Sequence, residues 1–177
     1  MDVNIWPYVE LSRSLIKKER KGFGNMFRHQ FETFVILLEY GYEDPILLKA
    51  ALIHDLFEDG HKVGFSGFDT VISIDTDGKE VYNLVMELSI RVKNDIEEPK
   101  DQFLERIMHE GSKRAKILKL ADRLSNINSL LATHDIPFIK RYLEETNLHI
   151  LPYAEEINKN IASELKKSLK NFDISLS

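Results

Sequence analysis

The sequence predicts an all-α fold, and three observations support that prediction. Apolar residues recur at helical spacing along most of the chain, most clearly over residues 114–131. Residues that end or begin helices fall between these segments, such as Gly41 and Pro45. The 177 residues, of which 43% are hydrophobic and 30% charged, suit one globular domain with its own core. We therefore expect a single domain over residues 1–177, built as a helical bundle.

The individual elements follow from the same periodicity. The expected helices cover residues 7–18, 27–40, 44–59, 81–88, 101–109 and 114–131, with one or two more over 139–172, broken near Pro152. Within 27–40 the apolar residues at positions 31, 34, 35 and 38 have the spacing of a helix. Residues 64–80 are rich in glycine and β-branched side chains, which predicts a turn or short hairpin. Residues 91–100 are predicted to form an exposed linker.

The composition excludes several classes of function. The chain has no cysteine, so disulfides and thiolate catalysis are excluded, and any metal must be held by histidine and carboxylate. A net charge of -5 argues against binding nucleic acid through a basic surface, although a small anionic substrate needs only a local basic cluster. No apolar run approaches the roughly 20 residues of a membrane span, and no signal peptide is evident. We therefore expect a cytoplasmic protein.

Residues 50–59 form the most informative stretch. In a helix of about 100° per residue, His54, Asp55, Glu58 and Asp59 fall within an arc of roughly 140°. Three carboxylates and an imidazole on one face of an otherwise apolar helix would repel each other. A divalent metal removes that conflict, because it is bound by neutral imidazole and anionic oxygen. On this stretch alone, a metal site and a solvated polar face are equal alternatives.

A wider set of residues favours the metal. His29 lies on the preceding predicted helix, and Asp122 lies beside the apolar stripe of residues 114–131, where it could pair with Arg123 or a lysine. Two histidines and two aspartates from three helices suffice for a metal site in a bundle core, with positions left open for water and substrate.

The order His29, His54-Asp55, Asp122 resembles the H…HD…D signature of HD-domain metal phosphohydrolases. Two segments narrow the resemblance to the RelA/SpoT-type (p)ppGpp hydrolases. Residues 51–59 are similar to their "ALLHDVVED" segment, and residues 119–126 are similar to "KLADRLHN". The resemblance covers roughly residues 10–165 and implies a stand-alone HD-type domain with a metal in its core.

The resemblance also implies a role for each matching residue. His29, His54, Asp55 and Asp122 would bind one divalent metal, manganese in the well-known relatives. Glu58 and Asp59 would handle the attacking water and the proton transfers. The residues expected to contact the anionic nucleotide are basic or amide side chains: Arg20, Lys21, Lys93 and Asn126.

Three departures from the family pattern lie on the nucleotide side of the site. Gly60 follows Glu58-Asp59 in place of threonine, and Asn128 stands where the family has arginine. The proline and tyrosine expected before His29 are missing. These changes bear on the guanine nucleotide more than on the metal.

The leading functional prediction is a manganese-dependent hydrolase that removes the 3′-pyrophosphate of (p)ppGpp, the nucleotide of the stringent response. Two alternatives stay open. One is an HD phosphatase acting on another nucleotide, such as a deoxynucleoside monophosphate or a nicotinamide dinucleotide phosphate. The other is a catalytically silent module that binds a metal or nucleotide. The sequence makes no prediction of the oligomeric state.

Overall fold

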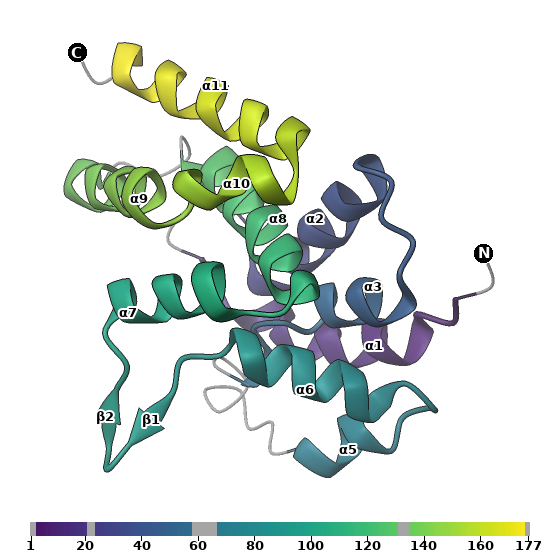
Figure 1. Cartoon of the computed structure of the whole chain (residues 1–177). Coiled ribbons are helices and arrows are strands. Elements are labelled where there is room, and N and C mark those ends of the chain that lie inside the picture. The colour runs from purple at the N-terminus through teal and green to yellow at the C-terminus, as the bar shows by residue number, and fades with distance from the viewer. Residues whose placement is uncertain (1–2, 21–23, 58–66, 131–134, 176–177) are drawn as a thin grey trace. The chain divides into compact units, whose positions relative to one another are not determined.

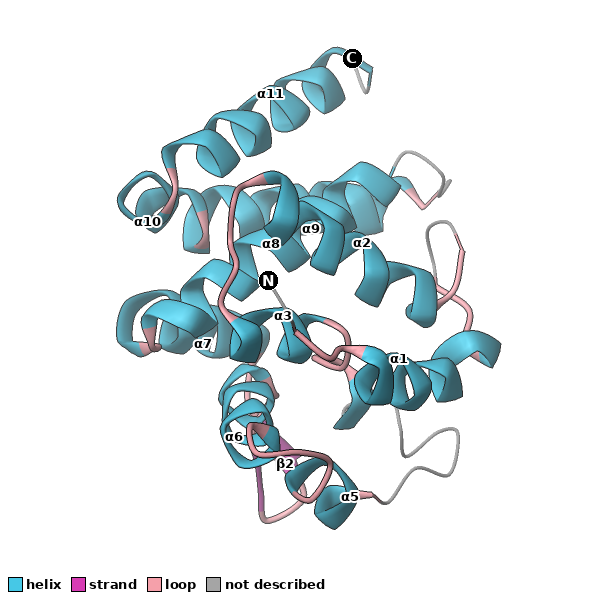
Figure 2. Cartoon of the chain, turned by 90° about the vertical axis from the view of Figure 1, so that its right-hand side faces the viewer, coloured by secondary structure: helices cyan, strands magenta, loops and turns pink. Residues whose placement is uncertain are grey.

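The structure, a computed structural model, describes residues 3–20, 24–57, 67–130 and 135–175. Helices make up most of these residues, which confirms the all-α prediction (Figure 2). Contacts divide them into two compact units, one ending at residue 91 and the other beginning at residue 92. We call these unit 1 and unit 2. None of the described helices is long and apolar enough to cross a membrane.

The described residues of unit 1 include six named helical elements. They are α1 (Trp6–Ser12), the 3₁₀ helix η1 (Arg13–Lys17), α2 (Met26–Glu39), α3 (Pro45–Ala51), α5 (Phe68–Ile72) and α6 (Gly78–Leu88). Helix α2 packs on η1 and α3, while α6 packs on α3 and α5 (Figure 1). Helix α3 therefore lies in the middle of the unit, and its side chains from residue 46 to residue 51 are all buried.

Unit 2 is assembled around α8. Its elements are β1 (Val92–Lys93), β2 (Ile96–Glu97), α7 (Lys100–Glu105), the π-helical turn η3 (Arg106–Glu110), α8 (Lys113–Leu130), α9 (Ile136–His149), α10 (Leu151–Ile157) and α11 (Lys159–Ser175). Helix α8 contacts η3, α9, α10 and α11. These contacts explain why α8 carries a longer run of buried side chains than any other described helix, as its apolar pattern predicts.

The turn residues of unit 1 behave as the sequence predicts. Gly41 has a φ of +75° and donates to the Leu38 carbonyl, and the next N–H bonds to Leu37, which is the Schellman arrangement at the end of α2. Asp44 caps the next helix by accepting from two backbone N–H groups, with Pro45 at the first helical position. These two devices fix where α2 ends and α3 begins.

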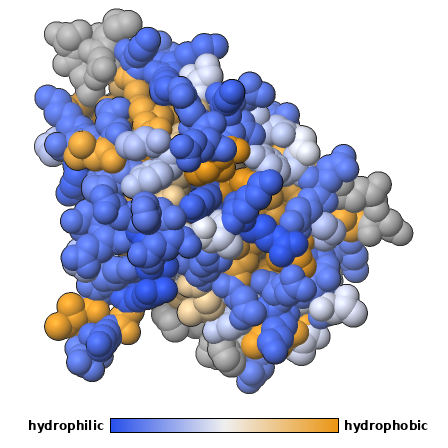
Figure 3. Space-filling view, in the orientation of Figure 1, coloured by the Kyte–Doolittle hydropathy of each residue, from blue (hydrophilic) through white to orange (hydrophobic). Residues whose placement is uncertain are grey.

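Three details differ from the sequence prediction. The first is the hairpin, which is formed by β1 and β2 in the segment predicted to be a linker. Its turn residues, Asn94 and Asp95, have φ values of +52° and +61°, the left-handed conformation of a tight two-residue turn. In the described part of 64–80 the chain instead forms α5 and the start of α6. The hairpin projects from unit 2 with Val92 and Ile96 63% and 72% exposed (Figures 1 and 3).

The second difference is the buried face of α2. The apolar residues at 31, 34, 35 and 38 are not its fully buried positions, since Val35 and Leu38 are 45% and 43% exposed. The buried positions are His29, Gln30, Thr33, Ile36 and Leu37. The face that packs inward is therefore partly polar, and the site described below accounts for two of its polar residues.

The third difference is the length of α3. The helix predicted over 44–59 ends at Ala51, and residues 52–55 form turns. The predicted helix is therefore interrupted at His54 and Asp55. Residues 58–66 lie outside the described residues.

A buried lysine connects three segments of unit 1. Lys49 on α3 is 5% exposed, and its Nζ donates to Asp75 and Asp77 at 2.7 Å each. The Tyr8 hydroxyl donates to the same Asp75 carboxylate at 2.9 Å. Burial alone would raise the pKa of Asp75, but the hydrogen bonds from Lys49 and Tyr8 outweigh it and lower that pKa. The cluster ties α1 and α3 to the α5–α6 turn.

We expect Lys49→Met to lower the free energy of unfolding by about 3 kcal/mol at neutral pH, the usual cost of breaking a buried ion pair. Because the native pKa of Asp75 is lowered, the pair stabilises the fold above the unfolded pKa of about 4. That contribution is lost as the pH falls through the native pKa. Urea unfolding of the wild type and variant at several pH values measures the difference, which should shrink in acid.

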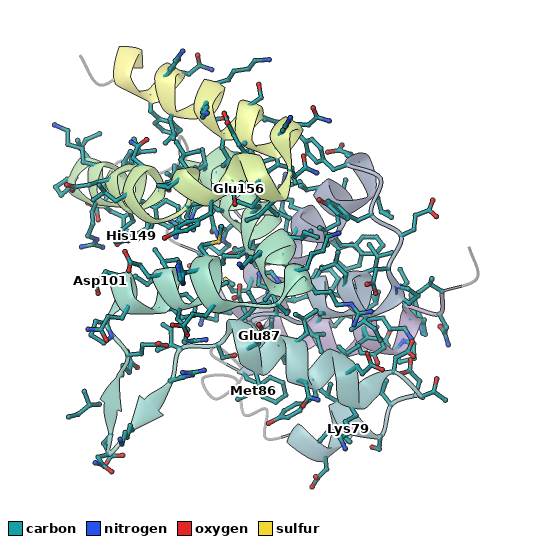
Figure 4. The ribbon with its side chains drawn as sticks, in the orientation of Figure 1. Lys79, Met86, Glu87, Asp101, His149 and Glu156 are labelled. Carbon is teal, nitrogen blue, oxygen red and sulfur yellow. The ribbon has the colours of Figure 1, made fainter. Side chains whose placement is uncertain are left out.

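Lys79→Met is the matched control. Lys79 is exposed near the start of α6, on the side opposite the buried residues of that helix (Figure 4). Its replacement should change the unfolding free energy by less than about 0.5 kcal/mol. Equal effects at the two lysines would contradict the assignment of Lys49 to a buried network.

Candidate metal centre

The first candidate ligand, His29, is placed by the start of α2. Asn25 caps this helix by accepting from the Arg28 N–H, and the His29 N–H bonds to the Asn25 carbonyl. This puts the imidazole in the second turn of the helix, on its inward face. The side chain is 1% exposed, so the ring belongs to the interior of the protein.

The turn after α3 places His54. Its Nδ1 lies 2.8 Å from the carbonyl oxygen of Ala51, the last residue of the helix. A carbonyl can only accept, so Nδ1 must carry the proton and the neutral ring keeps its lone pair on Nε2. Metal-binding histidines usually have this arrangement: one ring N–H donates to a backbone carbonyl, and the other ring nitrogen binds the ion.

Asp55 brings the two imidazoles together. Its Oδ2 lies 3.5 Å from His29 Nε2 and 3.4 Å from His54 Nε2. The two rings stand edge to face, with centroids 5.1 Å apart, and their ligand atoms lie within 4.8 Å of one another. Ligand atoms about 2.1 Å from one octahedral ion are separated by about 3 Å. Two imidazole nitrogens and one carboxylate oxygen at these spacings therefore fit a divalent metal with little adjustment.

Unit 2 holds the fourth candidate, Asp122. This side chain lies on α8 and is 5% exposed. Lys119, one turn earlier, donates to its Oδ2 at 2.8 Å, and the Asn126 amide donates to its Oδ1 one turn later. Lys119 is therefore the basic partner of Asp122. The sequence alone allowed either Arg123 or a lysine in that role. Arg123 instead contacts Glu145, Thr146 and the ring of Tyr142.

The residues predicted to contact substrate are only partly described. Glu58, Asp59 and Lys21 lie outside the described residues. Arg20 is half-buried, and its backbone N–H bonds to the Gly24 carbonyl. Lys93 is exposed on β1. The substrate roles of Arg20, Lys93 and Asn126 stay predictions.

Gln30 is a residue of this centre that sequence reasoning missed. Its Nε2 donates to Asp55 Oδ2 at 3.2 Å, the same oxygen that faces both imidazoles. Nothing in the sequence marks this glutamine except that it follows His29. Its contact depends on the turn at residues 52–55, which the sequence predicted as helix.

Comparison with solved structures identifies a protein of similar fold. No protein-family model matches the chain, and no curated protein matches its sequence. Among solved structures the chain is similar to a metazoan ortholog of SpoT that hydrolyzes ppGpp and plays a role in starvation responses. The TM-score is 0.79 and the sequence identity 22%, over 97% of this chain and 96% of the other. The fold predicted from the two sequence motifs is therefore confirmed: this chain has the all-α fold of that SpoT ortholog.

Proposed function

We propose that the protein is a metal-dependent phosphohydrolase whose ion is held by His29, His54, Asp55 and Asp122. The observation that carries the proposal is the meeting of two buried imidazoles at one carboxylate oxygen, 3.4 and 3.5 Å away. The fold shared with a ppGpp-hydrolysing protein supports the same conclusion. Asp122 joins the set as the buried aspartate of the KLADRL segment. Manganese is the proposed ion.

In the proposed chemistry, one part of the site holds the metal and the other part handles the water and the nucleotide. When bound, a divalent ion lowers the pKa of a water ligand and neutralises charge on a phosphate oxygen. The chain's own carboxylates would do the rest: Asp59 orients the nucleophile, and Glu58 exchanges protons with the nucleophile and the leaving group. Arg20, Lys21 and Lys93 would offset the negative charge of the substrate, each through a charge-assisted hydrogen bond.

We propose (p)ppGpp as the substrate and its 3′-pyrophosphate as the group removed. The two sequence segments resemble the hydrolases of this nucleotide, and the structural relative hydrolyses it. Asn126 would contact the sugar region of the nucleotide. Its amide also donates to Asp122, so it would link the metal half of the site to the nucleotide half.

A substrate panel tests this proposal. The purified protein would be stripped of metal, reloaded with Mn²⁺, and incubated with ppGpp, deoxynucleoside monophosphates and NADPH. We expect pyrophosphate and guanosine 5′-diphosphate from ppGpp, and no product without metal. Release of orthophosphate from another nucleotide would show that this nucleotide is the substrate in place of ppGpp. The proposal of a metal-dependent phosphohydrolase would stand. Absence of hydrolysis across the panel in metal-loaded protein would contradict both.

A further inference from the structure

Gln30 is a buried polar side chain beside the proposed metal ligands. It is 0% exposed and lies on the inward face of α2, directly after His29. Its amide must turn the nitrogen toward Asp55, because an ionised carboxylate can accept hydrogen bonds but cannot donate them. The 3.2 Å contact to Asp55 Oδ2 is thus a donated hydrogen bond to a charged acceptor.

Folding alone does not explain why the oxygen of the same amide is buried. Among the described residues, Gln30 Oε1 is buried and has no hydrogen-bond partner. A buried carbonyl oxygen without a partner costs stability, and an apolar side chain of the same length would avoid that cost. The fold alone therefore favours an apolar residue at this position.

Asp55 has a specific need for such a donor. Its Oδ2 faces His29 and His54 at 3.5 and 3.4 Å, so a small rotation of the carboxylate changes both distances. Asp55 lies in the turn after α3, outside any long helix that could hold it. A donor from α2 would fix the carboxylate from the same helix that carries His29.

We propose that Gln30 is a positioning residue that orients the Asp55 carboxylate for metal binding, at a cost in folding stability. This inference rests on the proposed metal centre. Residues that hold a metal ligand by a hydrogen bond commonly contribute 10–100-fold to metal affinity or activity. Functional positions also often lower stability relative to the best-packed alternative.

Gln30→Met tests the inference, since methionine keeps the length and volume of glutamine and removes both polar atoms. We expect calorimetric titration with Mn²⁺ to show about 10–100-fold weaker binding than in the wild type. The urea midpoint of the metal-free variant should equal or exceed that of the metal-free wild type. A merely structural glutamine would give the reverse result, with a lowered midpoint and unchanged metal affinity.

Two further variants make the test specific. Thr33→Val is the matched control: Thr33 is buried one turn later on α2, and its hydroxyl also has no hydrogen-bond partner among the described residues. Its replacement should leave the affinity for Mn²⁺ unchanged. Gln30→Asn keeps the amide but shortens its reach, so it should weaken Mn²⁺ binding as methionine does.

The outcomes separate this inference from the proposed function. A wild-type protein that binds no divalent metal would overturn the proposed centre itself. Wild-type binding with equal affinity in Gln30→Met or Gln30→Asn would overturn only the role of Gln30. Equal losses in Gln30→Met and Thr33→Val would also overturn it, because a general loosening of α2 would then explain both.

Discussion

Asp55→Ala is expected to abolish metal binding and hydrolysis together. The substitution removes Asp55 Oδ2, which lies 3.5 Å from His29 Nε2 and 3.4 Å from His54 Nε2. The proposed ligand set then keeps Asp122 as its one carboxylate, whereas a hard divalent ion prefers several anionic oxygens. We expect bound manganese to fall below one tenth of the wild-type content and kcat/KM to fall at least about 100-fold, the upper range for a supporting residue. Metal analysis after dialysis and a product assay measure the two losses.

Asp69→Ala controls for the loss of one negative charge. Asp69 is exposed on α5 within the same unit, and its replacement should change neither the metal content nor the rate. An Asp55→Ala protein that keeps its metal and loses only activity would show that Asp55 is not a ligand.

Asp122→Ala should give the same double loss, with an added cost in stability. Removing this carboxylate leaves the Lys119 ammonium, 8% exposed, without its 2.8 Å partner. The double variant Lys119→Met with Asp122→Ala removes the stranded charge. It should recover stability without recovering metal. Recovery of metal in the double variant would exclude Asp122 from the ligand set.

Glu58→Gln is expected to separate chemistry from metal binding. Glutamine has nearly the same shape as glutamate but cannot exchange a proton, and general acid–base groups usually contribute 10²–10⁴-fold to the rate. We therefore expect kcat to fall about 10²–10⁴-fold while the manganese content and its affinity stay at the wild-type values. Steady-state kinetics on the proposed substrate, with metal analysis of the same samples, provide both numbers.

The contradicting result for Glu58 is equally specific. If Glu58→Gln loses its metal, Glu58 is a ligand and the division between the His54-Asp55 pair and the Glu58-Asp59 pair is wrong. Asp59→Asn should also keep the metal, since both residues are assigned to the water. A difference between the two variants would show which carboxylate holds the nucleophile and which moves the proton.

Much of the fold could be predicted because local chemistry determines it. Helical periodicity gives α8, and Gly41, Asp44 and Pro45 mark the end of α2 and the start of α3 through hydrogen bonds within a few residues. The sequence predicted that His29, His54, Asp55 and Asp122 form a metal site. The structure brings the first three of these side chains together within unit 1, and their role as ligands stays a prediction.

The rest depended on contacts between segments. The periodicity of α2 suggested an apolar face at positions 31, 34, 35 and 38. In the structure the polar Gln30 and Thr33 are buried, and Val35 and Leu38 are among the exposed positions. A pattern of apolar residues cannot reveal that a glutamine is buried for its hydrogen bond to another segment. The hairpin was predicted in the wrong segment, because Asn94-Asp95 is a weaker turn signal than the glycines of residues 60–67.

The bond from His54 to the end of α3 has a consequence for the timing of metal binding. The imidazole is oriented when the backbone folds, because its Nδ1 takes the place of a backbone donor at the Ala51 carbonyl. Its rotamer entropy is therefore lost during folding, before any ion arrives. A preorganised ring needs no rearrangement to accept the ion or to release it. Metal-free and metal-loaded protein should accordingly share one conformation at this turn, and exchange of the ion should be limited by its ligand bonds and not by refolding.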